Sequence, residues 1–156
     1  KGWSYGVRSG ASMTLGPRVW QISAQVQTDK TGESIAELLS ELHALRKDRP
    51  FSAEELEDVR NERVRKLPAI TASATGILGY LTSIALYGQP DDFIEQRKDM
   101  YEAVSLDDLA PALDDRVDDG KFTWFIAGDV EKIENAVRSL ELGPVEVWDA
   151  DGKRLR

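Results

Sequence analysis

The chain has 156 residues, of which 41% are hydrophobic and 31% charged, a balance typical of a globular domain large enough to bury its own core. Its net charge is −8 and it has no cluster of Lys and Arg, which argues against nucleic acid as a partner because phosphate binding requires concentrated positive charge. The absence of cysteine excludes disulfides, thiol catalysis and thiolate metal sites, and no apolar run is long enough to span a membrane.

The first third of the chain predicts a β-hairpin followed by a helix. Residues 3–9 and 19–27 alternate between apolar and polar side chains, as half-buried strands do, and residues 10–17 between them are rich in turn formers. From residue 31 the apolar positions recur at helical spacing instead. We therefore expect an antiparallel hairpin and then an amphipathic helix over Gly32–Lys47.

The middle of the chain predicts a block of helices. Ser52 and Glu55 have the spacing of a capping box, and the helix that they open should stop at Pro68. An apolar helix should follow and end at Gly88, whose lack of a side chain suits a helix C-terminus. That helix covers residues 70–87, and further start and stop signals predict helices over 91–103 and 105–117.

The last third predicts a strand, a helix and a strand. Residues 121–127 read KFTWFIA and residues 145–149 read VEVWD, both rich in residues that favour strands. Asp129 is the expected cap of the helix between them. With strands at both ends and helices between, the fold class is α+β: an antiparallel or mixed sheet packed on one side by helices, in a single domain over residues 1–156.

No complete catalytic or metal site is visible. A catalytic zinc needs three protein ligands, usually with histidine among them, and His43 is the only histidine. The acidic segments 114–120 and 149–152 lack the closing acid of a calcium loop and read as turns, while Asp129 would repel a phosphate. The residues thus predict a chain that is inactive alone and holds no cofactor, with a calcium- or anion-binding module as a weaker alternative.

The opening stretch KGWSYGVRSG resembles the K-G-x-x-Y strand motif in the second, metal-free domain of pitrilysin/insulinase-type zinc peptidases. Further segments resemble that domain in the same order. These are QVQTDKTGESIAELLSEL, PFSAEELEDVRNERVRKLP, YGQPDDF and AGDVEKIENAVRSLELGPVEVWDADG. The resemblance implies half of a peptidase clamshell, whose partner domain or subunit carries H-x-x-E-H and the zinc and closes with it around a peptide.

The resemblance also implies a role for one residue. Tyr5 matches the tyrosine of K-G-x-x-Y, which helps to hold the substrate backbone or the developing oxyanion. The arginine that usually stands seven residues before that tyrosine would fall before Lys1 and cannot be assigned. Without the family, a strand tyrosine is commonly a core residue, and Trp3, Trp20 and Trp124 also read as packing residues.

Two functions are expected from this resemblance. The leading one is a non-catalytic, substrate-clamping domain of a zinc endopeptidase, and the alternative is a structural or assembly subunit with the same fold. Analogy with bacterial relatives suggests the periplasm, otherwise the cytoplasm. The chain starts inside the motif, which suggests an N-terminally truncated domain without its first strand and helix. The uncovered sheet edge would then favour self-association.

Overall fold

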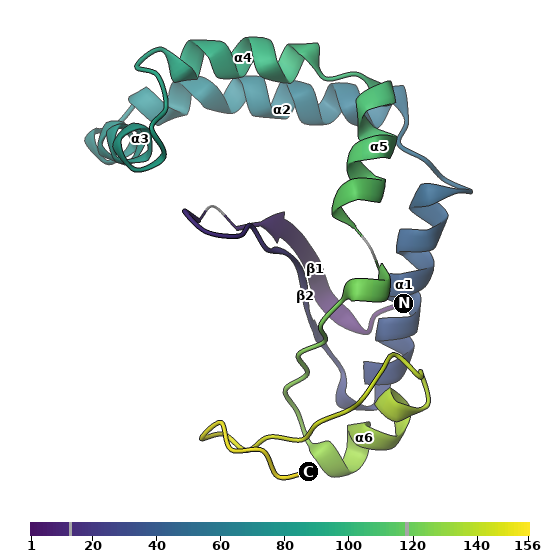
Figure 1. Cartoon of the computed structure of the whole chain (residues 1–156). Coiled ribbons are helices and arrows are strands. Elements are labelled where there is room, and N and C mark those ends of the chain that lie inside the picture. The colour runs from purple at the N-terminus through teal and green to yellow at the C-terminus, as the bar shows by residue number, and fades with distance from the viewer. Residues whose placement is uncertain (13, 118) are drawn as a thin grey trace. The chain divides into compact units, whose positions relative to one another are not determined.

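The computed structural model describes residues 1–12, 14–117 and 119–156 (Figure 1). The chain divides into two compact units. The hairpin unit comprises Lys1–Gly10, Trp20–Ala44 and Asp118–Arg156, and the helical unit comprises Ala11–Val19 and Leu45–Val117. Strands and helices together confirm the predicted α+β class. A single domain over residues 1–156 stays a prediction.

The hairpin unit begins with the two strands and the helix that its sequence predicts. Strands β1 (Ser4–Ala11) and β2 (Trp20–Val26) form an antiparallel two-stranded sheet. At its open end the Gln27 N–H donates to the Trp3 carbonyl at 3.0 Å. A short 3-10 turn, η1 (Thr28–Lys30), then leads into α1 (Thr31–Arg46), close to the predicted bounds.

The last third of the chain differs from its prediction. After η2 (Asp119–Lys121), residues 122–127 run as an irregular, stretched-out segment into α6 (Val130–Arg138), and residues 145–149 also form no strand (Figure 1). The two strands predicted there are therefore wrong in the described structure. The physical reason is that a strand needs a hydrogen-bonded neighbour along its length: among the described residues 123–127 make no main-chain hydrogen bond, and Val147 and Asp149 bond only to the last few residues, which gives one isolated bridge from Trp148 to Arg154.

The helical unit contains α2 (Ala53–Thr71), α3 (Ala74–Tyr87), α4 (Phe93–Ala103) and α5 (Leu106–Arg116). The capping box is confirmed: Ser52 Oγ accepts from the Glu55 N–H at 3.1 Å, and the Ser52 N–H donates to Glu55 Oε2 at 2.8 Å. Gly88 ends α3 with a φ of 63°.

The predicted end of α2 at Pro68 is wrong, because the helix continues to Thr71. Leu67, the residue before this proline, is only 7% exposed, so burial of this turn outweighs the local preference against proline inside a helix. Among the described helices none is by itself long and apolar enough for a membrane span. Only α2 and α3 taken together meet those criteria, and that pair is bent by 105°.

Both units bury few side chains. The buried apolar residues are Ile35, Ile133 and Val147 in the hairpin unit and Leu67 and Val117 in the helical unit, and no described side chain is less than 2% exposed. The accessible surface of the chain is 12033 Å². Two separate compact units, each with half the mass of the chain, would together expose about 9,500 Å². The units therefore leave surface uncovered that compact units would bury.

Candidate functional site

Tyr5 lies in β1, and its side chain is fully exposed, at 108% of the reference value. The residues on either side of Tyr5 are hydrogen-bonded to each other: Ser4 Oγ donates to the Gly6 carbonyl at 2.9 Å and accepts from the Gly6 N–H at 3.1 Å. The phenol is thus available to a ligand and contributes nothing to the core of the hairpin unit.

Gly6 sets the backbone beside Tyr5. Its φ of 150° lies in the region that favours glycine, and a Cβ added there would meet no atom within 4 Å. A residue with a side chain would therefore be disfavoured at this position by its backbone conformation and not by a clash with neighbouring atoms. A glycine with open space at this point allows another main chain to approach the strand closely.

Trp3 anchors the start of β1 beside α1. Lys1 Nζ and Lys30 Nζ lie 5.1 and 5.8 Å from the centre of its ring, within the range of a cation–π interaction. Each lysine also pairs with a glutamate of α1, Lys1 with Glu37 and Lys30 with Glu33. The hydrogen bond between Lys30 and Glu33 raises the pKa of the lysine amine and lowers the pKa of the carboxyl.

The other two tryptophans read as packing residues are both half-buried. The rings of Trp20 and Phe122 lie 6.1 Å apart, and those of Phe122 and Trp124 lie 6.0 Å apart. These contacts join β2 to the segment that follows η2. The three aromatic residues thus pack together, which agrees with the predicted packing role of Trp20 and Trp124.

The residues weighed as metal ligands are not brought together. His43 lies on an exposed position of α1, and no group of three or more His, Asp or Glu in the described chain could hold a metal ion. Asp129 pairs with Lys132 at 2.8 Å, and Asp149 Oδ1 accepts main-chain N–H bonds within its own turn. Asp118, part of the acidic segment 114–120, lies outside the described residues.

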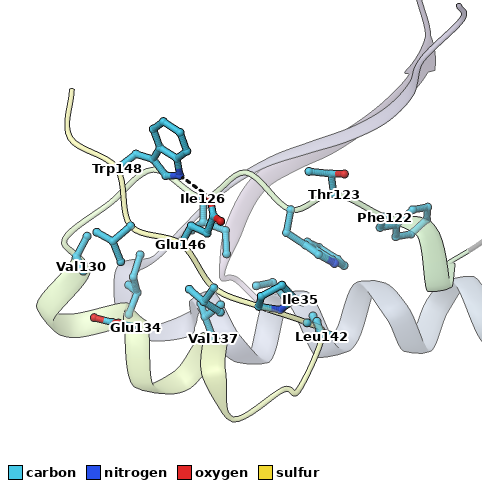
Figure 2. A pocket seen from close by; sticks show the side chains of 16 residues that line it. Ile35, Phe122, Thr123, Ile126, Val130, Glu134, Val137, Leu142, Glu146 and Trp148 are labelled. Atoms are coloured by element: carbon cyan, nitrogen blue, oxygen red, sulfur yellow. Dashed lines mark hydrogen bonds between the residues drawn. The ribbon is translucent and has the colours of Figure 1, made fainter. Parts of the chain in front are cut away.

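The hairpin unit has a cavity of about 320 Å³ beside α6 (Figure 2). Ile126, Val137 and Leu142 give it apolar walls, and two glutamates lie among the side chains around it. Glu146 accepts from Trp148 Nε1 at 3.2 Å, the dashed line in Figure 2. Glu134 accepts from both Arg156 and Arg138, which hold the pKa of its carboxyl below the ordinary value. Both carboxylates are thus already engaged within the chain.

A second cavity, of about 470 Å³, lies between β2, α1 and residues 124–128. Ile22 and Val26 of β2 face it, and Ser34 Oγ of α1 is buried beside it with no hydrogen-bond partner. The sequence analysis missed this cavity, because it depends on segments far apart in the chain. The one related signal in the sequence is the strand pattern of residues 121–127, a segment that lines the cavity and has no strand beside it in the described structure.

Residues 1–63 match the family described as the peptidase M16 inactive domain. The matched residues contain β1, β2, α1 and the first part of α2, and hence Tyr5 and the KGWSYG motif. The segments YGQPDDF and AGDVEKIENAVRSLELGPVEVWDADG lie beyond the match. No curated protein matches the chain.

Proposed function

We propose, from the match of residues 1–63 to the peptidase M16 inactive domain, that the chain clamps peptide substrates for a separate zinc-bearing peptidase domain. The predicted resemblance to pitrilysin/insulinase-type peptidases is confirmed, and with it the assignment as a peptidase-related, non-catalytic domain. The match to an inactive domain supports a peptidase domain as the partner of this chain, and it fits the prediction that this chain carries no catalytic metal of its own.

The observation that carries the proposal is the exposure of Tyr5 within the matched residues. A buried tyrosine would be a packing residue, but this phenol is fully exposed on a strand with open space at the next residue. Its O–H can donate to a peptide carbonyl or to the negative oxygen that develops as the peptide bond is attacked. Such a donor acts most strongly when closure of the two domains excludes water around it.

The proposed division of labour rests on the match to an inactive peptidase domain. The zinc would be held by the partner domain, where its chemistry would be to activate water for attack on the peptide bond. The hydroxyl of Tyr5 holds the substrate oxygen, and the open backbone at Gly6 lets the peptide main chain approach. This chain alone should not hydrolyse peptides. By analogy with bacterial relatives alone, we propose the periplasm as its compartment.

A second function is supported by the helical unit. No residue of α3 is buried, and Ile77, Leu78 and Leu81 are 43%, 64% and 54% exposed. Exposed apolar side chains that lie together on one helix are typical of a surface that another protein covers. A structural or assembly subunit would use that surface without using Tyr5, so the two functions predict different effects of a Tyr5 variant.

The test is an activity assay on this chain mixed with a candidate zinc-bearing half. We expect cleavage of an unstructured fluorogenic peptide only in the mixture, and we expect a zinc chelator to abolish it. Tyr5→Phe should lower kcat/KM by about 100-fold, the usual cost of losing one oxyanion donor. The matched control is Tyr101→Phe, which removes a hydroxyl bonded to Arg97 at 2.6 Å in the helical unit and should leave activity unchanged. Equal activity of Tyr5→Phe and the parent mixture would refute the clamp.

A further inference from the structure

The two strands of the hairpin differ in length by one residue. At the open end the Gln27 N–H donates to the Trp3 carbonyl, and at the other end the Ser12 N–H donates to the Val19 carbonyl at 2.8 Å. Between these two bonds lie the eight residues of β1 and the seven residues of β2. One residue of β1 therefore has no residue of its own opposite it on β2. Such an extra residue is a β-bulge.

The bulge lies at Gly6. Among the residues of β1, Gly6 alone has a positive φ, and a glycine inside a strand commonly marks a bulge. Both of its main-chain polar groups are bonded to Ser4 Oγ, so they have a local partner, as the extra residue of a ladder requires. The strand thus changes register directly after Tyr5.

The bulge brings Tyr5 and Arg8 to the same face of the sheet. Counted from the bond at the open end, Tyr5 stands opposite Gln25, and counted from the bond at the other end, Arg8 stands opposite Ser23. Residues 23 and 25 are two apart on a regular strand, so they share a face and lie about 6.8 Å apart. Without the bulge, the three-residue separation of Tyr5 and Arg8 would place them on opposite faces.

Arg8 is the only charged residue of β1 and β2, although 31% of the chain is charged. Its side chain is exposed, and among the described residues its guanidinium has no ion pair or hydrogen bond. A guanidinium carries two parallel donors that match the two oxygens of a carboxylate. Arg8 is therefore an uncompensated cation on an otherwise uncharged sheet, two strand positions from the exposed phenol of Tyr5.

We propose that Arg8 determines specificity by selecting peptides with an acidic side chain two residues from the peptide bond that is held at Tyr5. This inference rests on the proposed function, since it places the substrate beside Tyr5. An extended peptide advances about 6.8 Å in two residues and turns the side chains of those residues to the same side. The spacing of an acidic residue from the held bond thus equals the spacing of Arg8 from Tyr5. The substrate class that fits this face is an extended peptide with a glutamate or aspartate at that position.

The proposal is tested on the mixture of this chain with the zinc-bearing half. Fluorogenic peptides that differ at one position carry glutamate, glutamine or lysine two residues from the cleaved bond, on its N-terminal side in one set and on its C-terminal side in the other. We expect one glutamate peptide to have a kcat/KM about tenfold above that of its glutamine version, as for a hydrogen bond between charged groups. Because the contact is ionic, this ratio should fall toward one as the salt concentration rises.

Variants of the chain assign the selection to one residue. Arg8→Gln should lower the ratio to about one, and Arg8→Glu should make the lysine peptide the preferred substrate. The matched control is Arg65→Gln, at an exposed arginine of α2 in the helical unit, and it should keep the ratio of the parent mixture. A parent ratio near one, a ratio unchanged by Arg8→Gln, or an equal loss with Arg65→Gln would each overturn the role of Arg8.

Tyr5→Phe separates this inference from the proposed function. It should lower kcat/KM for the glutamate and glutamine peptides alike and leave their ratio intact. Loss of activity with Tyr5→Phe in a mixture that shows no preference for glutamate would overturn only the role of Arg8. Activity unchanged by Tyr5→Phe, with a preference that still depends on Arg8, would overturn only the role of Tyr5.

Discussion

Ile133 offers a quantitative test of how the hairpin unit is packed. This residue of α6 is 6% exposed and borders both cavities. Its replacement by alanine removes three carbon atoms, and about 0.8 kcal/mol for each buried carbon gives a loss of about 2.4 kcal/mol. Deletion in a tightly packed core adds a further cost for the new cavity. That additional cost should be small here, since the side chain already adjoins empty space, so we expect a total of about 2.5 kcal/mol.

The assay exploits the distribution of tryptophans. Trp3, Trp20, Trp124 and Trp148 all lie in the hairpin unit. Tryptophan fluorescence during urea unfolding therefore reports on this unit, whereas far-UV circular dichroism also reports on the helical unit. Ile133→Ala should lower the free energy of unfolding followed by fluorescence by about 2.5 kcal/mol. Ile133→Val, which removes one carbon, should lower it by about 0.8 kcal/mol.

The control is Val59→Ala at a residue of α2 that is 52% exposed, and it should change stability by less than about 0.5 kcal/mol. Two results would refute the reasoning on Ile133→Ala. A loss of about 4 kcal/mol or more would mean a tightly packed site without adjoining cavities. A loss well below about 1 kcal/mol would mean that Ile133 is not part of a core.

Three further predictions concern local contacts. Ser52→Ala removes the cap of α2 and should cost about 1 kcal/mol in unfolding followed by circular dichroism; no loss would contradict the contribution of the cap. Gly88→Ala forces a φ of 63° on a residue with a side chain and should cost about 1 kcal/mol in the same signal; no loss would contradict the observed helix end. The pKa of Glu134 lies below its ordinary value of 4.5 because Arg156 and then Arg138 donate to it, so its contribution to stability is present above pH 4.5 and is lost as the pH falls through the lowered pKa. Glu134→Gln should therefore reduce the acid-dependent loss of stability in a urea–pH series, and an unchanged series would refute this assignment.

The features that the sequence predicts correctly are those decided by residues close together in the chain. The capping box of Ser52 and Glu55 spans four residues, and the turn at Gly88 depends on one. The hairpin of β1 and β2 also joins neighbouring segments. In each case the interaction partner lies within reach of the local pattern, so composition and spacing suffice.

The predictions that were wrong depend on distant partners. The composition of KFTWFIA gives residues 121–127 a preference for strand, but the hydrogen bonds of a strand must come from another segment, and in the described chain residues 123–127 receive no main-chain hydrogen bond. The end of α2 at Pro68 was wrong for a similar reason, because the burial of Leu67 is decided by packing between helices. Local preference is overridden wherever tertiary contacts are stronger or missing.

The candidate site was predictable in part. The motif KGWSYG singled out Tyr5, but only the structure reveals that its side chain is fully exposed. Neither cavity could be predicted, since the walls of both combine α1 with segments about 90 residues further along the chain.

The most direct test of the central claim compares the effect of Tyr5→Phe on stability with its effect on activity. Because the side chain is fully exposed, the variant should unfold within about 0.5 kcal/mol of the parent chain by tryptophan fluorescence. In the mixture with the zinc-bearing half it should lower kcat/KM for the fluorogenic peptide by about 100-fold. Unchanged stability together with lost activity is the result that the clamp predicts. Unchanged activity would contradict it and leave the chain a structural subunit.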